Sequence, residues 1–183
     1  DKVYDRTTTA SLNTSSAVFT GVIGSDSLNL TAATGNFNNK NAGSNKSVSV
    51  TGMTLGGISS ANYELTAVSA TATANITSKS VTITNATVAD RTYDGTVNIS
   101  VNTANASLSG VIAGDSITLS SGYAAGIFAD KNVGTGKTVT VTGFALTGCA
   151  TDVANYQLSQ PTGLTANVTA KTITVADLSV NSK

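Results

Sequence analysis

Carboxylates, tyrosines and lysines are the groups of this 183-residue chain that could carry chemistry, because the sequence contains no histidine. Histidine is the commonest general base and the commonest transition-metal ligand, so a hydrolytic triad of the usual form is excluded. Most aspartates stand in turn sequences, where a carboxylate hydrogen-bonds its own backbone; these are Asp5, Asp26, Asp94, Asp115 and Asp130. We therefore predict no catalytic residue, no cofactor and no metal ligand, and we expect that the chain is not an enzyme.

Charge and apolar patterning argue against two classes of partner. Ten Lys and Arg residues balance ten Asp and Glu residues, and the cations form no cluster. This argues against nucleic acid, whose phosphates require concentrated positive charge. No apolar run approaches the roughly 18 residues of a membrane-spanning helix, so membrane insertion is not expected. The single cysteine, Cys149, cannot form an internal disulfide.

An internal repeat organises the whole chain. Tyr4-Asp5-Arg6 recurs as Tyr93-Asp94-Gly95, and Gly21-Val22-Ile23 recurs as Gly110-Val111-Ile112. The same order continues through four further pairs of segments: 37–46 and 128–137, 48–52 and 139–143, 61–65 and 154–158, and 74–77 and 166–169. We predict two repeats, residues 1–84 and 85–176, with residues 177–183 as the start of a following repeat.

Both copies show the period of two that is typical of β-strands. Polar and apolar residues alternate in segments 46–51, 80–84 and 137–142, where Val, Ile and Thr dominate. No segment has a sustained helical stripe, and residues 11–17 are the only candidate for a short helix. The sequence predicts an all-β chain of two tandem antiparallel domains in an elongated, end-to-end arrangement. Each domain is expected to be sandwich-like, and a β-grasp-like fold with one short helix is the alternative.

The aromatic residues fit a structural role, with two exceptions. Six of them occupy equivalent places in the two copies and are expected in cores or at domain junctions: Tyr4 and Tyr93, Phe37 and Phe128, and Tyr63 and Tyr156. Tyr123 and Phe144 have no aromatic counterpart in the first copy, which makes them better candidates for contact with a ligand. We single out Tyr123, Asp130 and Asn132 as candidate ligand contacts, with a glycan as the expected ligand.

The motifs of the second copy resemble a known repeat. Tyr93-Asp94-Gly95, segment 128–137 and Ala154-Asn155-Tyr156 are similar to the YDG-type repeat of very large bacterial surface proteins. These proteins are adhesins of the filamentous-haemagglutinin and two-partner-secretion kind. The first copy departs from the motif at Arg6 and Asn39, where the repeat has Gly and Asp. The resemblance implies an extracellular location, on the outer membrane or secreted, and brings no catalytic residues.

Together with the repeats, the resemblance implies a non-catalytic stalk or spacer module of a bacterial surface adhesin that supports attachment to cells or matrix. An adhesin module that binds a glycan or another ligand is the alternative. The partners implied are neighbouring repeats of the same polypeptide and a host or matrix glycan or protein. We expect the chain to be a monomer.

Overall fold

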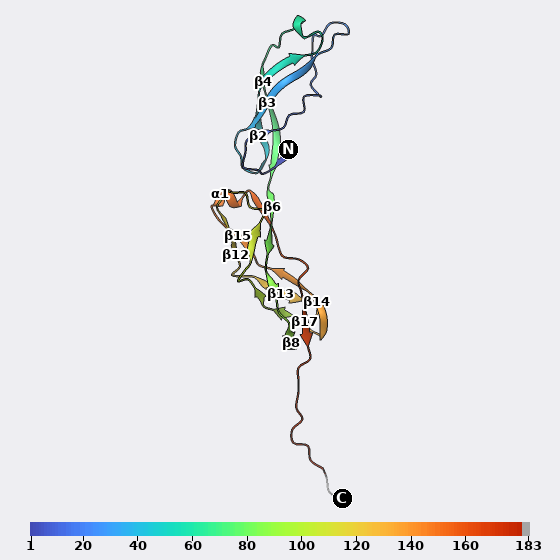
Figure 1. Ribbon diagram of the computed structural model, residues 1–183, viewed down its shortest axis with the longest axis vertical. Coiled ribbons are helices and arrows are strands. Elements are labelled where there is room, and N and C mark those ends of the chain that lie inside the picture. Colours follow the sequence, from blue (N-terminus) through green and yellow to red (C-terminus); the bar gives the residue numbers. More distant parts are fainter. Residues whose placement is uncertain (181–183) are drawn as a thin grey trace. The chain divides into compact units, whose positions relative to one another are not determined.

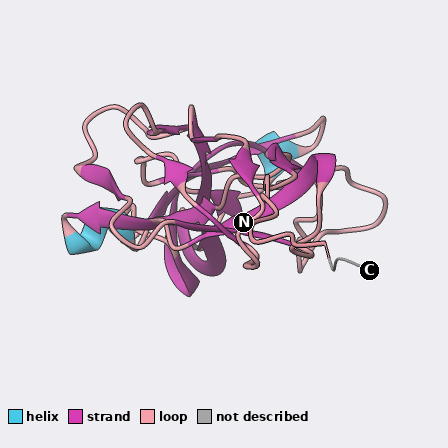
Figure 2. Cartoon of the chain, turned by 90° about the horizontal axis from the view of Figure 1, so that it is seen from below, coloured by secondary structure: helices cyan, strands magenta, loops and turns pink. Residues whose placement is uncertain are grey.

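Strands and loops make up nearly the whole of the computed structural model, which describes residues 1–180 (Figure 1). Within those residues, helix is confined to single turns at η1 (Ser60–Asn62) and α1 (Ala150–Val153), drawn in cyan in Figure 2. The prediction of an all-β chain is confirmed. The predicted start of a following repeat, residues 177–183, lies partly outside the described residues. Within residues 1–180, no helix is long and apolar enough to cross a membrane.

The chain divides into two compact units, which follow the two repeats except at two segments. Unit 1 contains Asp1–Ser80 together with Ile112–Ser116 and Cys149–Gln157, two segments that belong to the second repeat. Unit 2 contains the remaining residues. The compact units therefore cross the boundaries of the sequence repeats.

Each unit contains a five-stranded sheet. The strands of unit 1 are β1 (Lys2–Val3), β2 (Thr9–Ala10), β3 (Asn29–Phe37), β4 (Gly43–Gly56) and β5 (Ser69–Thr77). Those of unit 2 are β8 (Arg91–Thr92), β9 (Asn98–Ile99), β13 (Ala125–Phe128), β14 (Gly134–Thr142) and β17 (Thr165–Thr169). The spatial orders, β1-β5-β4-β3-β2 and β8-β17-β14-β13-β9, are equivalent. The sheets are antiparallel as predicted, except that β1 pairs parallel to β5 and β8 pairs parallel to β17.

Seven further strands form three smaller sheets. In one of them β6 (Lys79–Thr84) lies between β11 (Ser107–Ser109) and β16 (Tyr156–Ser159). The others pair β7 (Thr87–Val88) with β10 (Val101–Asn102), and β12 (Ile117–Ser120) with β15 (Ala145–Gly148). The turn between β6 and β7 is part of a folded unit, because Ala86 is buried in the core of unit 2.

One face of the unit 2 sheet is buried in an apolar core, as the alternating sequence predicts. Its buried members are Ala86, Ile99, Phe128, Val139, Val141, Phe144, Ala166 and Val168. Phe144, which the sequence made a candidate for contact with a ligand, is buried in this core and only 5% exposed. Its backbone N–H and C=O both bond the side-chain amide of Gln160, at 3.2 and 2.9 Å, and this fixes the residue over the core.

The predicted short helix at residues 11–17 is absent. Asn13 Oδ1 accepts hydrogen bonds from the backbone N–H and the hydroxyl of Ser15, at 3.1 and 2.7 Å. A side-chain turn of this kind competes with helical backbone hydrogen bonds. The segment is therefore an irregular connection.

Neighbouring residues of β13 test the assignment of buried and exposed faces. Phe128 is 2% exposed and Ile127 is 46% exposed. Phe128→Ala should lower the free energy of unfolding of unit 2 by about 3–5 kcal/mol, because it leaves a cavity. Ile127→Ala should change it by only about 0.5 kcal/mol. Urea unfolding followed by circular dichroism measures both, and equal losses would contradict the assigned faces.

Candidate functional site

The three ligand contacts predicted from the sequence are not brought together by the fold. Tyr123 precedes β13 and is 89% exposed, whereas Asp130 and Asn132 follow that strand. Asp130 Oδ1 accepts hydrogen bonds from the backbone N–H of Asn132 (2.8 Å) and from Lys137 Nζ (2.6 Å). Asn39 makes the corresponding turn in the first copy. Asp130 therefore closes a turn, and the role of these three residues as ligand contacts stays a prediction.

A cluster of polar groups in unit 1 is centred on the buried carboxylate of Asp115. We call this cluster the clasp, and define it as Asp115, Tyr156, Tyr4 and Arg6. Asp115 and Tyr156 lie in the two segments that the second repeat contributes to unit 1, while Tyr4 and Arg6 follow β1 in the first repeat. The clasp therefore joins residues of both repeats inside one compact unit.

Two tyrosine hydroxyls share one oxygen of the Asp115 carboxylate. Tyr156 Oη donates to Oδ2 at 2.7 Å, and Tyr4 Oη donates to the same atom at 2.9 Å. The two rings pack edge to face, with centroids 5.5 Å apart and planes at 77°. The side chain of Asp115 is 0% exposed and Tyr4 is 1% exposed, so water is excluded from these bonds.

Two cations face the other oxygen of the carboxylate. Arg6 Nε lies 3.1 Å from Asp115 Oδ1, and Lys40 Nζ lies 3.8 Å from it. Arg6 Nη1 also donates to the carbonyl of Ala113 at 2.7 Å. Arg6 has a φ of 69°, a left-handed conformation that is uncommon outside glycine. A buried carboxylate is costly unless it is paired and hydrogen-bonded, and the clasp supplies both.

A second buried polar group, Asn155, lies beside the clasp. It is 0% exposed, and both its side-chain amide and its backbone carbonyl form hydrogen bonds. Its Oδ1 accepts from the backbone N–H of Ala42 at 2.7 Å, and its Nδ2 donates to the carbonyl of Thr151 (2.9 Å) and to Asn41 Oδ1 (3.2 Å). Its own carbonyl accepts from the N–H of Lys79 at 2.9 Å. Asn155 therefore ties the second repeat to a loop of the first.

The environment of the clasp fixes its protonation at neutral pH. Burial acts to raise the pKa of Asp115, but the hydrogen bonds from Tyr156 and Tyr4 and the nearby cations outweigh it, so the pKa lies below its usual range. Burial and the hydrogen bond to Asp115 raise the pKa of both Tyr4 and Tyr156 above the ordinary tyrosine value. The clasp is thus one carboxylate held by two neutral phenols.

The clasp encloses its carboxylate between segments of the two repeats. Asp115 Oδ2 accepts two hydrogen bonds, whereas Oδ1 faces Arg6 and Lys40 and accepts no hydrogen bond from the described residues. Because the side chain is 0% exposed, the carboxylate has no open side for a substrate. Among the residues that the structure describes, groups of three metal-ligating His, Cys, Asp or Glu side chains do not occur.

The clasp was not predicted from the sequence, because Asp26 and Asp115 stand in turn sequences and were expected to hydrogen-bond their own backbone. That interpretation is wrong for both residues, since each accepts a hydrogen bond from a tyrosine hydroxyl about 40 positions further along the chain. It is confirmed for Asp5 and Asp94, which accept from the N–H two residues ahead. The recurrence of the same Asp and Tyr in both copies was the available signal.

Comparison with protein families gives a match to the family described as YDG domain, over residues 1–73 and 77–163. The chain belongs to this family. The two matched segments correspond to the two repeats, so each repeat is one YDG domain in sequence. Searches of curated proteins and of solved structures found no match.

On this finding the expectation of a bacterial adhesin repeat is wrong. The name YDG is known from SRA-type domains, which bind DNA and read methylcytosine, and the family description names no adhesin. The function of an adhesin stalk and its ligand-binding adhesin alternative are overturned with it. The same use of the name conflicts with the expectation that nucleic acid is not a partner.

The pKa shifts of the clasp residues predict how the stability of unit 1 depends on pH. Because the folded-state pKa of Tyr4 and Tyr156 is raised, their stabilisation is complete below about pH 10, where unfolded tyrosine begins to ionise, and is lost as pH rises through the folded value. The Asp115 contribution has the opposite sign, since its pKa is depressed. It is present above about pH 4 and is lost as pH falls through the folded value.

Tyr4→Phe should therefore flatten the alkaline decline of the urea midpoint above about pH 10. Asp115→Asn should flatten part of the decline of the urea midpoint at acidic pH, because it removes the carboxylate whose pKa is depressed in the folded state. Unfolding curves collected across the pH range measure both slopes. If the wild type and Tyr4→Phe lost stability equally steeply at high pH, the clasp tyrosines would not be its source.

Proposed function

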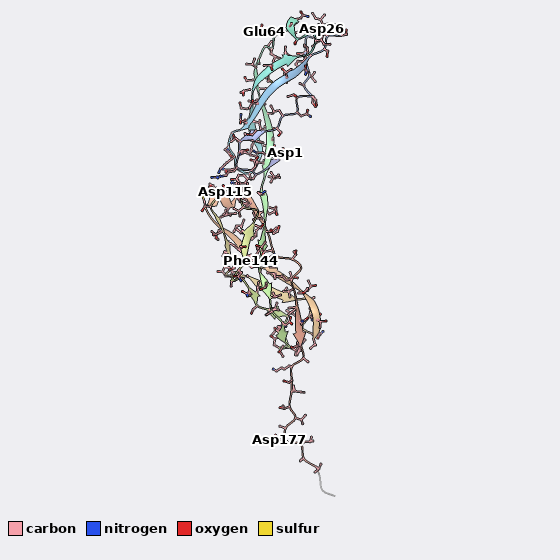
Figure 3. The ribbon with its side chains drawn as sticks, in the orientation of Figure 1. Asp1, Asp26, Glu64, Asp115, Phe144 and Asp177 are labelled. Carbon is pink, nitrogen blue, oxygen red and sulfur yellow. The ribbon has the colours of Figure 1, made fainter. Side chains whose placement is uncertain are left out.

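We propose that this chain is a non-catalytic repeat module in which the clasp fastens segments of the second YDG repeat onto the first. One observation carries the proposal. Asp115, whose side chain is 0% exposed, is covered by Tyr4 and Arg6 of the first repeat, whereas the exposed Asp26 bonds Tyr63 and Ser59 of its own repeat. In Figure 3 the two aspartates lie at opposite ends of unit 1.

The strength of the clasp follows from the charge of its acceptor. A hydrogen bond to a charged group contributes about 1.5–3 kcal/mol, roughly twice the contribution of a neutral one. Tyr4 and Tyr156 each make such a bond to Asp115. The edge-to-face ring contact adds about 0.5–1.5 kcal/mol. This is enough to hold both segments in unit 1, although Ile112–Ser116 forms no helix or strand and Cys149–Gln157 contains only the single turn of α1 and the start of β16.

Hydrogen exchange tests whether the clasp holds the segments. Tyr4→Phe removes one hydroxyl and keeps the ring, so it should lower the protection of Ile112–Ser116 and Cys149–Gln157 by about tenfold to a hundredfold. Protection of β14 in unit 2 should not change. Mass spectrometry of peptic fragments from the intact chain measures both effects.

Tyr63→Phe is the matched control, because Tyr63 makes the equivalent bond to Asp26 in the first copy, at 2.6 Å. It should leave the protection of Ile112–Ser116 unchanged. The proposal fails if Tyr4→Phe leaves that segment as protected as in the wild type, or if Tyr63→Phe exposes it equally.

DNA binding is a second candidate function, which the family name favours. Against it, five cations among residues 1–180 already face a carboxylate: Lys2 with Asp5, Arg6 and Lys40 with Asp115, Arg91 with Asp94, and Lys137 with Asp130. Phosphate binding requires free Lys and Arg side chains, and each ion pair reduces that supply.

Fluorescence anisotropy with methylated and unmethylated duplexes separates the two candidates. We expect weak binding that disappears between about 50 and 200 mM salt, without preference for methylcytosine. Saturable binding at physiological salt that favours the methylated duplex would establish the DNA candidate instead.

A further inference from the structure

Arg6 occupies a position that the second copy fills with glycine. Asp5 Oδ1 accepts a hydrogen bond from the backbone N–H of Thr7 at 2.9 Å, and the equivalent bond of the second copy has the same length. These matching turns give Arg6 a φ of 69° and its equivalent, Gly95, a φ of 84°. Glycine adopts such left-handed angles freely, whereas arginine rarely does. The first copy therefore has an arginine where the local backbone favours glycine.

Arg6 contacts a turn of the second repeat at two points, and glycine could supply neither contact. Its Nε lies 3.1 Å from Asp115 Oδ1, a buried oxygen that accepts no hydrogen bond from the described residues. Its Nη1 donates to the carbonyl of Ala113 at 2.7 Å. A strained residue persists where its surroundings compensate for the strain. These two contacts compensate for the unfavourable backbone of Arg6.

The turn that Arg6 contacts has a different type in each copy. In both copies the N–H of the aspartate bonds the carbonyl of the isoleucine three residues earlier, at 3.2 Å. The central residues are Gly24-Ser25 in the first copy and Ala113-Gly114 in the second. In each turn only the glycine has a positive φ, 61° for Gly24 and 92° for Gly114. A left-handed residue at the second position makes a type II′ turn, and one at the third position makes a type II turn.

The turn type decides where the acceptor of Arg6 points. Type II and type II′ turns are mirror images, so the carbonyl of the central peptide lies on opposite sides of the two turns. In the second copy this carbonyl belongs to Ala113, and it accepts the hydrogen bond from Arg6 Nη1. A type II′ turn at the same place would direct the carbonyl away from Arg6.

Gly114 also leaves free the space that the guanidinium occupies. A Cβ at residue 114 would overlap Arg6 Nη1 and lie 2.6 Å from Arg6 Cζ, which is closer than Cβ atoms approach in real structures. A side chain there would displace the guanidinium from Asp115 and from Ala113. The first copy has Ser25 at this position. Its turn therefore differs from the second in both features on which Arg6 depends.

The remainder of the turn is the same in both copies. The N–H of Ile23 donates to Tyr63 Oη at 3.0 Å, and the equivalent bond from Ile112 to Tyr156 has the same length. The tyrosine hydroxyl donates to the aspartate at 2.6 Å in the first copy and at 2.7 Å in the second. Exchanging the central residues should therefore change the contact with Arg6 and leave the bond between aspartate and tyrosine in place.

We propose that Arg6 makes the clasp selective. The edge of the first repeat accepts a turn with glycine at its third position, as in Ala113-Gly114-Asp115, and rejects the Gly24-Ser25-Asp26 turn of its own repeat. Selectivity of this kind combines an attractive contact to the right partner with a repulsive contact to the wrong one. Glycine, which the second copy has in place of Arg6, would not distinguish the two turns. The inference rests on the proposed function, since it names the residues that decide which segment the clasp holds.

Exchanging the turn sequence with and without Arg6 tests this selectivity in the full chain. Ala113→Gly combined with Gly114→Ser gives the second copy the turn sequence of the first. With Arg6 present, the exchange should lower the hydrogen-exchange protection of Cys149–Gln157 by at least about tenfold. In the Arg6→Gly background it should change that protection by less than about twofold, because no guanidinium remains for the turn to displace.

Gly114→Asn separates the side chain from the turn type. Asparagine tolerates a left-handed φ at the third position, so the type II turn should remain and only a side chain is added. This variant should lower the protection of Cys149–Gln157 with Arg6 present and leave it unchanged in the Arg6→Gly background. It replaces the full exchange if the exchange alters the protection of β14, which reports on unit 2.

Gly24→Ala combined with Ser25→Gly is the matched control, because it makes the reverse exchange in the first copy. It should leave the protection of Cys149–Gln157 unchanged, since Arg6 contacts Ala113 and Asp115.

Equal losses of protection with Arg6 and in the Arg6→Gly background would overturn the inference. So would full protection of the exchanged turn with Arg6 present, or a loss in the control. Tyr4→Phe tests the clasp without changing Arg6 or the turn. If Tyr4→Phe exposes the segments but the exchange acts equally in both backgrounds, the proposed function stands and this inference alone is removed.

Discussion

A carboxylate excluded from water is costly unless it has donors and cations around it, and unit 1 gives Asp115 two donors at Oδ2 and two cations facing Oδ1, which accepts no hydrogen bond from the described residues. Tyr4 and Arg6 approach it from the start of the chain, and Tyr156 approaches from the segment after α1. The left-handed backbone of Arg6 brings its guanidinium against the carboxylate and the neighbouring carbonyl at once. If any of these groups were withdrawn, the charge would remain buried with fewer partners. The three parts of the chain therefore fold together.

The two copies show that the same motif can be buried or exposed, depending on which segments pack against it. Asp26 with Tyr63 and Asp115 with Tyr156 have nearly the same geometry, yet the first pair is exposed and the second lies inside unit 1. Asn62 and Asn155 differ in the same way, since the former is exposed and the latter is 0% exposed. Identical residue types thus contribute differently to stability, according to which segment covers them.

Features that depend on neighbouring residues could be predicted from the sequence, and features that depend on distant pairing could not. The strands were predictable because alternation at a period of two places Val48 and Val139 on buried faces. The turns at Asp5 and Asp94 were predictable because the carboxylate reaches the N–H two residues ahead. The clasp was not, because Tyr4 and Asp115 are 111 positions apart and only the strand order brings them together. Phe144 was misjudged because the distant Gln160 holds it over the core.

Because unit 1 includes a segment from late in the sequence, it constrains the order in which the chain can fold during synthesis. Its final segment, Cys149–Gln157, is made only after most of unit 2 has been synthesised. Domains ordinarily fold from the N-terminus as they emerge, and contacts of large sequence separation form slowly because closing a long loop costs entropy. Unit 1 begins to fold first, but it cannot complete its fold until residue 157 has been made. Until then the nascent first repeat remains open at its Tyr4 edge.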